Sequence, residues 1–556
     1  MTSAHSGPRT MWTSIATGFI IVAGALRLIG YFSQGQLYID DARLALNIAS
    51  RSWSDLTRPL DYGQVAPIPF LWLEKLATQI GGINDYALRA IPLLAGITVL
   101  YLLWRVGRRA FGDQSATLAT CLGALSSILI SYASAVKQYS SDALATLLLL
   151  WLVLDALRAT DDRAVWWRLT VGGVTALWFS HPAVFVLAGA ALALPAHAAV
   201  RATPNWQRRH AVTTIAWVSM FAAMYFLVYR TGERDPYLRG FWDWTFLSPG
   251  APDFGARAWR AVRAMLVPPI WSGGTLLGTP LFLGGLTTVA FVTGLVAMFR
   301  TQGPSLALLC GSPYVAVLGA GMIGTYPPAD RFLLFAAPLL FFIYGSALWW
   351  AATAFPPWAR TPAVVATLVL LTLGSYPTAL EEGLHPKRRR ETKALLNTVE
   401  ARAPRAPVYL FTPRISCTCS PWVLYTTDWS APDTVRLRRF ARNWADTRAS
   451  PPAEGITPTS AEAVSFKSGR HRELIGAGAH IPYVPIAQSP EPDPEWVRRE
   501  SDRIRGAANP IAWLWASEPF PESTIAALLH GIRARGGRLI FAGRVLGATA
   551  WEVEFP

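Results

Sequence analysis

Apolar residues form long continuous runs over the first two thirds of the chain, separated by short polar connections. A helix needs about 20 mostly apolar residues to cross a bilayer. The pattern predicts eleven membrane-spanning helices, over residues 12–33, 88–110, 114–133, 138–157, 166–180, 181–199, 209–230, 277–299, 304–325, 331–352 and 362–380. Because the runs are continuous and do not alternate, they exclude an outer-membrane β-barrel.

One apolar stretch is too long for a single crossing and is interrupted near its middle. Residues 166–199 would form one run, but Ser180, His181 and Pro182 break it. Proline lacks the backbone donor that a helix needs, and it disfavours helix at the residue before it. The sequence therefore predicts two short helices in a hairpin. No small-residue cleavage site follows the range 12–33, so we expect an anchor there and not a cleaved signal peptide.

Basic residues set the expected orientation, because short cytoplasmic loops carry an excess of Lys and Arg. Alternate connections between the predicted spans are rich in arginine, at Arg105, Arg108, Arg109, Arg158, Arg163, Arg168, Arg201, Arg208, Arg209, Arg300 and Arg360. The intervening short connections carry only Lys137 and Arg331. We therefore expect the N-terminus in the cytoplasm and, with eleven spans, the C-terminal region outside. Two long loops, 34–87 and 231–276, would also lie outside.

The last part of the chain has shorter apolar segments and predicts a small α/β domain. The expected strands lie at 406–411, 422–427, 511–516, 538–542 and 550–555. Residues 523–535 have helical periodicity, and a glycine pair directly after them is expected to end that helix. The stretch 449–495 is rich in Pro, Ser and Glu, which is typical of a long loop.

Charge density separates these two parts of the chain. Residues 1–383 contain 44 charged residues, about 11%, whereas residues 384–556 contain 41, about 24% and close to the average of soluble domains. We therefore expect a membrane domain over 1–383 and a soluble domain over 384–556. The same contrast excludes a wholly soluble enzyme, a disordered protein and a fibrous protein.

The net charge of +15 indicates loop topology and contact with anionic membrane lipids. A nucleic-acid partner is not expected, because the chain has no zinc-finger spacing, no RNP-like segment and no basic helix. Its densest basic run, residues 387–390, directly follows a hydrophobic segment.

The four cysteines do not form a disulfide framework. Cys121 and Cys310 lie in apolar runs, where a thiol is expected to serve packing. Cys417 and Cys419 form a C-x-C pair without a second pair, which gives too few ligands for a zinc site. The pair is compatible with a strained local disulfide or with two free thiols.

Polar residues gather next to the predicted outer ends of the spans, where ionisable groups are costly and often functional. Asp40 and Asp41 open the first outer loop, which continues through Asp61 to a Gln-x-x-Pro-x-Pro stretch beginning at Gln64. Two further segments are expected on the same face: one carries Lys137, Tyr139 and Asp142, the other Tyr326 and Arg331.

At these residues the chain resembles the GT-C class of membrane glycosyltransferases, in particular the protein O-mannosyltransferase and aminoarabinose transferase type and the bacterial RgtA/B/C/D-like branch. The resemblance rests on the acidic pair, the Gln-x-x-Pro-x-Pro stretch, the Lys-Gln-Tyr-Ser-Ser-Asp segment from Lys137 and the Tyr-Pro…Arg-x-Leu-Leu-Phe segment from Tyr326. It implies an all-α polytopic membrane domain with a small extracytoplasmic α/β domain. The chain departs from the class at Asp41, where Glu is common.

The resemblance implies transfer of a sugar from a polyprenyl-phosphate donor to a cell-envelope acceptor, which is a lipid, a glycan or a protein. Asp40 matches the first acid of the class motif and is expected to accept the proton of the acceptor hydroxyl. Asp41 would position the acceptor or hold Asp40. Lys137 and Arg331 are expected to bind the donor phosphate, because fixed cations stabilise the charge of the leaving group. The sequence indicates no metal site, and it leaves a metal requirement open.

The remaining candidates are expected to contact substrate, and they are Gln64, Tyr139, Asp142, His181 and Tyr326. The aromatic residues Phe241, Trp242, Trp244 and Trp271 are candidates for stacking on sugar or isoprenoid.

Structural interpretations stay open for most of these residues. Lys137 and Arg331 are also compatible with side chains that reach to lipid headgroups, and Asp142 with a charge favoured at a helix amino end. Gln64 and His181 are compatible with hydrogen bonding in a loop and in a turn, and the aromatic residues with an interfacial belt. A rival function is a transporter or flippase of lipid-linked glycans, but internal repeats and charges at the membrane midplane are lacking.

Overall fold

The structure, a computed structural model, divides the chain into two compact units. We call residues 1–34, 52–59 and 65–387 the helical unit, and residues 35–51, 60–64 and 388–556 the mixed unit. The described residues are 8–33, 37–229, 240, 242–267, 280–373, 376–384, 395, 398, 401–402, 408–411, 424, 483–485, 494–507, 511–517, 522–545 and 548–555.

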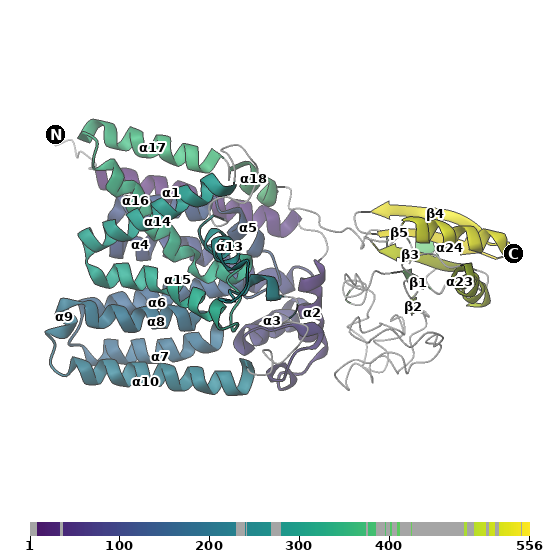
Figure 1. Cartoon of the computed structure of the whole chain (residues 1–556), viewed down its shortest axis with the longest axis horizontal. Helices are drawn as coiled ribbons and strands as arrows, with labels where there is room; N and C mark the ends of the chain where they lie inside the picture. The colour runs from purple at the N-terminus through teal and green to yellow at the C-terminus, as the bar shows by residue number, and fades with distance from the viewer. Residues whose placement is uncertain are drawn as a thin grey trace. The chain divides into compact units, whose positions relative to one another are not determined.

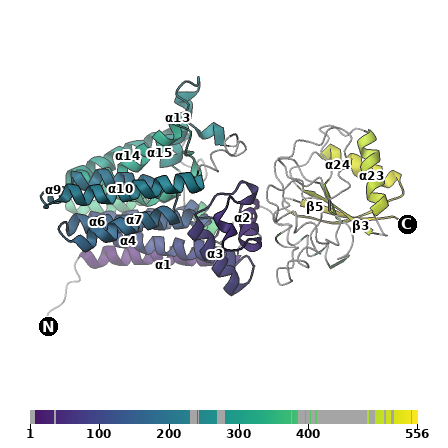
Figure 2. The same cartoon turned by 90° about the horizontal axis from the view of Figure 1, so that it is seen from below.

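In the helical unit most of the long helices run side by side along one direction (Figures 1 and 2). Its α-helices are α1 (Pro8–Ser33), α3 (Ile68–Gly81), α4 (Ala90–Ala124), α5 (Ser127–Tyr132), α6 (Tyr139–Arg158), α7 (Arg163–Phe179), α8 (Ala183–Ala196), α9 (Ala198–Arg201), α10 (Trp206–Met224), α13 (Phe254–Leu266), α14 (Pro280–Gln302), α15 (Pro304–Met322), α16 (Ala337–Ala352), α17 (Pro357–Leu373) and α18 (Tyr376–Leu384). Short 3-10 turns are η1 (Asp55–Thr57), η3 (Ala87–Arg89), η5 (Asp243–Thr245) and η6 (Asp330–Ala336), and η4 (Tyr225–Tyr229) is a π-helical turn.

Seven helical stretches in the described part of the chain are long and apolar enough to cross a membrane. They are Met11–Ser33, Ala87–Ala124, Tyr139–Arg158, Trp206–Val228, Gly284–Gln302, Pro304–Met322 and Arg331–Ala352. The unit is therefore a multi-span membrane structure, as the apolar pattern predicts.

Helix α4 is a hairpin of two antiparallel halves and not one long helix. Gly112 lies at the turn with φ of 83°, a conformation that residues with a Cβ atom rarely adopt. The halves then pack closely, because a Cβ atom on Gly107 would lie 3.0 Å from that of Ala116. Gly112 thus lies at the turn between the two predicted spans, 88–110 and 114–133. The end of the second predicted span forms a separate short helix, α5.

The predicted break near Pro182 is confirmed as the boundary between α7 and α8. Ser180 is extended and ends α7 at Phe179, and α8 begins at Ala183. The predicted span 362–380 differs from the structure, which divides it between α17 and α18.

The core of the helical unit is apolar and centres on α16. This helix packs against α4 and α14, and its side chains are buried along most of its length. Around it, α8 packs on α15, α6 on α4 and α7, and α10 on α7. Cys121 and Cys310 are buried unpaired thiols in these helices, in agreement with a packing role.

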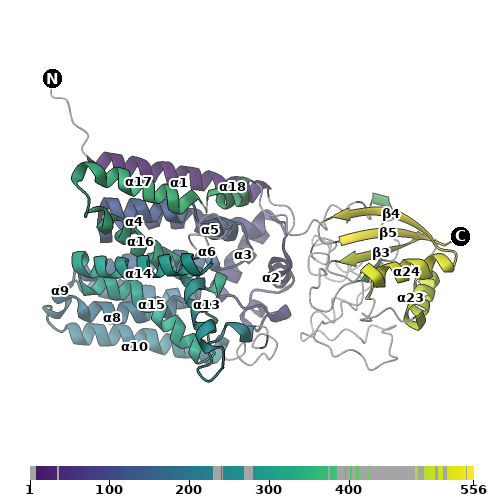
Figure 3. The same cartoon turned by 45° about the horizontal axis from the view of Figure 1, so that its top comes forward.

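The mixed unit contains a five-stranded sheet with the strand order β2-β1-β3-β5-β4. All five strands are labelled in Figure 1, and Figure 3 shows β3, β5 and β4 beside one another. Its elements are α2 (Ile39–Ser50), the 3-10 turn η2 (Asp61–Gly63), β1 (Val408–Phe411), β2 (Tyr483–Pro485), α23 (Pro494–Ala507), β3 (Ile511–Ser517), α24 (Glu522–Ala534), β4 (Arg538–Val545) and β5 (Ala548–Glu554). Strand β1 pairs in parallel with β2 and β3, whereas β5 pairs antiparallel with β3 and β4. Ile504, Leu514 and Leu528 belong to one buried cluster that joins α23 and α24 to the sheet.

Four of the predicted strands correspond to β1, β3, β4 and β5, and the predicted helix 523–535 corresponds to α24. Gly536 ends α24 with φ of 83°, as the glycine pair predicts. The loop prediction for 449–495 is wrong at its end, because β2 and the first two residues of α23 lie there. The predicted strand 422–427 is outside the described residues except at Leu424, and Cys417 and Cys419 are outside them entirely.

Candidate active site

Asp40 and Asp41 lie in the first turn of α2. The amino end of a helix carries partial positive charge, which stabilises carboxylates in that turn. Both residues are half-buried. Successive helical residues do not face one another, so the two carboxyl groups point in different directions. Only one of the two carboxylates can therefore face a given acceptor hydroxyl as its base.

A polar frame holds α2 against the turn η2. Asn47 Oδ1 accepts a hydrogen bond from the Asp61 backbone N–H at 2.9 Å, and Asn47 Nδ2 donates to the Asp61 carbonyl at 3.3 Å. Arg51 forms a buried ion pair with Asp61, with 3.0 Å between Nη2 and Oδ2. We call Asn47, Arg51 and Asp61 the polar frame.

The polar frame fixes the place of Gln64, which directly follows η2. Gln64 is buried, and its Nε2 donates to Asp40 Oδ1 at 3.5 Å. This contact brings together two residues that the sequence singles out.

In the helical unit, the segment that begins α6 carries a buried cation. Lys137 is only 7% exposed, Tyr139 begins the helix, and both belong to the Lys-Gln-Tyr-Ser-Ser-Asp segment. The Ser140 hydroxyl donates to the Tyr132 carbonyl at 3.0 Å, which fixes the turn before the helix. The ring of Tyr132 packs edge-on against that of Tyr139, with 5.0 Å between centroids.

Arg331 lies on aromatic rings at the start of η6, which packs on α6. Its guanidinium carbon is 5.4 Å from the ring centre of Trp242 and 5.7 Å from that of Phe332. The Tyr326 hydroxyl donates to the Phe332 carbonyl at 2.7 Å and holds the turn in place. A guanidinium over such rings is attracted by their negative faces.

These rings form one continuous group, which we call the aromatic cluster: Tyr132, Tyr139, Phe185, Trp242, Tyr326, Phe332 and Phe335. Phe332 contacts Tyr139, Tyr326 and Trp242, with centroid distances of 6.2, 6.0 and 4.8 Å. Phe185 of α8 joins at 4.9 Å from Tyr326 and stacks on Phe335 at 5.7 Å. The cluster thus connects four segments that are far apart in the sequence.

Asp142 and His181 lie near the same helix starts. Asp142 is 3% exposed in the first turn of α6 and lies beside Ser180, the residue before His181. The position agrees with the helix-end interpretation of Asp142.

The structure therefore brings the predicted site residues together in two groups. Asp40 and Gln64 meet in the mixed unit, while Tyr139, Tyr326 and Arg331 meet around Phe332 in the helical unit. Their catalytic roles stay predictions. Phe241 and Trp271 are outside the described residues, whereas Trp242 belongs to the aromatic cluster.

The sequence did not single out Asn47, Arg51 or Phe185. Asn47 and Arg51 are four residues apart and share one face of α2, which is a detectable signal. Their partner Asp61 lies across a loop, and no local pattern identifies such a pair.

No three His, Cys, Asp or Glu side chains lie together among the described residues. No step below depends on a metal.

Residues 65–230 match the family model described as dolichyl-phosphate-mannose-protein mannosyltransferase. No curated protein matches the chain. Among solved structures, apo ArnT from Cupriavidus metallidurans has a TM-score of 0.52 and 14% identity, covering 97% of this chain and 98% of that chain. ArnT bound to undecaprenyl phosphate has a TM-score of 0.49 and 13% identity, covering 99% and 98%.

The archaeal oligosaccharyltransferase AglB from Archaeoglobus fulgidus, in complex with an inhibitory peptide and a dolichol-phosphate, has a TM-score of 0.44 and 12% identity over 96% of this chain and 74% of that chain. At identities this low, structural similarity shows the fold alone. The fold assignment here rests on the similarity to apo ArnT. Residues 65–230 are thus similar to the dolichyl-phosphate-mannose-protein mannosyltransferase family, and the chain is a multi-pass membrane glycosyltransferase of the GT-C class.

Proposed function

We propose that the protein transfers a sugar from a polyprenyl-phosphate donor to a cell-envelope acceptor, a lipid, a glycan or a protein, on the extracytoplasmic face. The matched family is described by a dolichyl-phosphate sugar donor, which supports the donor class. The observation that carries the proposal is Arg331 over the rings of the aromatic cluster in the helical unit, together with the buried Lys137 two residues before Tyr139 of that cluster.

The reaction needs a base, and Asp40 takes this role in the proposal. The acceptor oxygen attacks the anomeric carbon, its proton passes to the Asp40 carboxylate, and the bond from that carbon to the phosphate oxygen breaks. Asp40 lies at the amino end of α2, and Gln64 orients its carboxylate before the attack. Asp41 positions the acceptor or holds Asp40.

The leaving group is a lipid phosphate, whose charge grows as the bond breaks. Arg331 binds it with a fork of donors and Lys137 as a point charge. The rings of Trp242 and Phe332 beside Arg331 shield it from water, and a cation stabilises developing charge more strongly where the dielectric constant is low. Tyr139, Asp142, His181, Tyr326 and Gln64 contact the sugar or the acceptor in the proposal.

The proposed topology has eleven crossings, a cytoplasmic N-terminus, a membrane domain over 1–383 and an extracytoplasmic domain over 384–556. It adds the second half of α4 and the shorter helices α7, α8 and α17 to the seven long candidates. The arginines at the α4 turn and at the α6–α7 connection support the orientation.

Labelling with a membrane-impermeant thiol reagent tests this topology in intact cells. In a background with Cys417 and Cys419 replaced by Ser, Ser248→Cys should be labelled and Asn205→Cys should not, because they lie in an outer and an inner connection. Labelling of position 205 in intact cells contradicts the orientation.

The function is tested by incubating the purified protein in lipid vesicles with a synthetic polyprenyl-phosphate sugar and a cell-envelope extract. We expect radiolabelled sugar to move to an acceptor and polyprenyl phosphate to accumulate. Movement of the intact donor across the vesicle membrane without transfer contradicts the proposal and indicates a flippase.

A further inference from the structure

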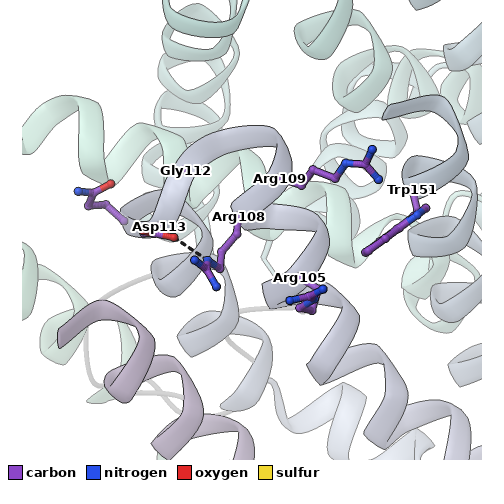
Figure 4. Close-up of a pocket in the computed structure, with 7 residues that line it drawn as sticks. Arg105, Arg108, Arg109, Gly112, Asp113 and Trp151 are labelled. Atoms are coloured by element: carbon purple, nitrogen blue, oxygen red, sulfur yellow. Dashed lines mark hydrogen bonds and ion pairs between the residues drawn. The ribbon is translucent and has the colours of Figure 1, made fainter. Parts of the chain in front are cut away.

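The helical unit has a second charged site, at the other end of α6 from Tyr139. A pocket of about 690 Å³ opens at the α4 turn, and it is lined by Arg105, Arg108, Arg109, Gly112, Asp113, Gln114 and Trp151 (Figure 4). The three arginines are spaced i, i+3 and i+4, so they share one face of the first half of α4. We call this site the arginine pocket.

The arginine pocket carries more positive than negative charge. Arg108 pairs with Asp113 across the turn, with 2.6 Å between Nε and Oδ1, and Arg109 pairs with Asp155 of α6. Arg158 adds another cation by donating to the Arg109 carbonyl. Four arginines thus meet two aspartates, which leaves an excess of two positive charges for an anionic ligand.

Aromatic side chains hold the arginines at the rim of the pocket. Arg108 lies 4.6 Å from the ring centre of Trp104, and Arg109 lies 5.1 Å from that of Trp151. Arg105 is exposed and lies 6.0 Å from the ring centre of Tyr101. Trp and Tyr beside Arg are typical of the boundary between hydrocarbon and headgroups.

The backbone contributes to the same electrostatics. Gly112 breaks the helix, so the second half of α4 begins at the pocket with Asp113 and Gln114. The amino end of a helix offers unpaired N–H groups to an anion. The arginines, the charge excess and this helix start all favour a phosphate group.

The place of the pocket along α6 favours a lipid over a soluble ligand. Trp151 and Asp155 lie 12 and 16 residues after Tyr139, which is about 18 and 24 Å along a helix. The helix as a whole is long enough to cross the hydrocarbon core. The exposed Arg105 therefore lies at headgroup depth.

We infer that the arginine pocket binds the phosphate of an anionic glycerophospholipid in the leaflet at this end of α6. In the topology proposed above, that leaflet is the cytoplasmic one. The site is separate from sugar transfer, because the proposed donor-binding residues lie at the Tyr139 end.

Native mass spectrometry of the full-length protein in detergent tests this inference, with phosphatidylglycerol and phosphatidylcholine as probes. We expect bound phosphatidylglycerol to survive delipidation and phosphatidylcholine to be lost. Arg105→Ala should weaken phosphatidylglycerol binding about fivefold, the usual effect of one basic residue near an anionic lipid, and Arg105→Glu should weaken it further. Arg105 forms no ion pair among the described contacts, so these variants should fold.

Arg208→Ala is the matched control, since it removes an exposed arginine from another predicted inner connection and should leave lipid binding unchanged. Equal binding of the two lipids, or unchanged phosphatidylglycerol binding in Arg105→Glu, overturns the inference. Displacement of the lipid by excess inorganic phosphate also overturns it and identifies a site for soluble phosphate. This measurement records lipid binding and not sugar transfer. A negative result here is therefore distinguishable from a failure of the proposed function.

Discussion

The charged residues proposed for the reaction are held in two different ways in the two units. In the mixed unit, Asp40 belongs to a segment fixed by hydrogen bonds and a buried ion pair between Arg51 and Asp61. In the helical unit, Arg331 rests on the rings of Trp242 and Phe332.

The difference corresponds to what a base and a phosphate-binding cation need. A base must keep its position and its charge until the proton arrives, and polar neighbours supply both. A cation stabilises a leaving group best where water is excluded, and aromatic rings do this without neutralising it. The following substitutions test whether the two regions differ in this way.

Replacement of Asp40 tests the base and has the largest expected effect. Asp40→Asn keeps the shape of the side chain but cannot accept a proton, so kcat should fall by about 10²–10⁴-fold while donor affinity changes little. Single-turnover transfer and donor binding measure the two quantities. Asp41→Asn should fall between this variant and the wild type. A near wild-type rate for well-folded Asp40→Asn would make Asp41 the candidate base.

The ion pair of the polar frame can be tested by replacing Arg51 alone or by replacing Arg51 and Asp61 together. Arg51→Ala leaves the buried Asp61 carboxylate without its cation, which should cost about 3–5 kcal/mol in the free energy of unfolding. Thermal unfolding and transfer activity should both decrease. The double variant Arg51→Met/Asp61→Leu should be more stable than Arg51→Ala, because no buried charge is left unpaired. Equal stability of Arg51→Ala and the wild type contradicts a structural role of the pair.

Arg331 should affect donor binding as well as rate, in contrast to Asp40. Arg331→Ala removes charged hydrogen bonds to the phosphate, so the donor Kd should rise by about 10- to 150-fold and kcat should also fall. Arg331→Lys should recover part of the affinity, since it keeps the charge and loses the fork. Arg168→Ala, an exposed arginine in α7, is the matched control. An unchanged donor Kd in Arg331→Ala would remove Arg331 from the donor site.

Replacement of Trp242 tests the aromatic support of Arg331 and has the smallest expected effect on donor binding. Trp242→Ala removes one of the two rings beneath Arg331, which should weaken donor binding by about 2- to 30-fold. Trp242→Phe keeps a ring and should lie closer to the wild type. Isothermal titration with a non-hydrolysable donor analogue measures both. If the loss is equal in Trp242→Ala and Trp242→Phe, the ring is not what supports the cation.

The sequence predicts the helices well, because crossing a bilayer imposes a length and a composition that are visible locally. The break at Pro182 and the turn between 110 and 114 also have local causes, because Pro and Gly change the backbone wherever they occur. The end of the loop prediction for 449–495 failed because β2 has three residues and depends on pairing with β1, which no local pattern records.

The candidate site was predictable only in part. Asp40, Gln64, Lys137 and Arg331 stand out because polar residues beside apolar runs are conspicuous. The contact of Tyr139 with Phe332 joins residues 193 positions apart, and the ion pair of Arg51 with Asp61 crosses a loop. Such pairs depend on the path of the chain in space, so residue types and spacing alone do not identify them.

The one-residue turn in α4 has a consequence for how the protein enters the membrane during synthesis. Gly112 leaves no loop between the two halves, so neither half can be released into the bilayer long before the other. We expect the hairpin to insert as a pair, with the arginines beside the turn kept on the side from which synthesis proceeds. A short tag inserted at Gly112 should then block membrane insertion, whereas the same tag between α6 and α7 should be tolerated.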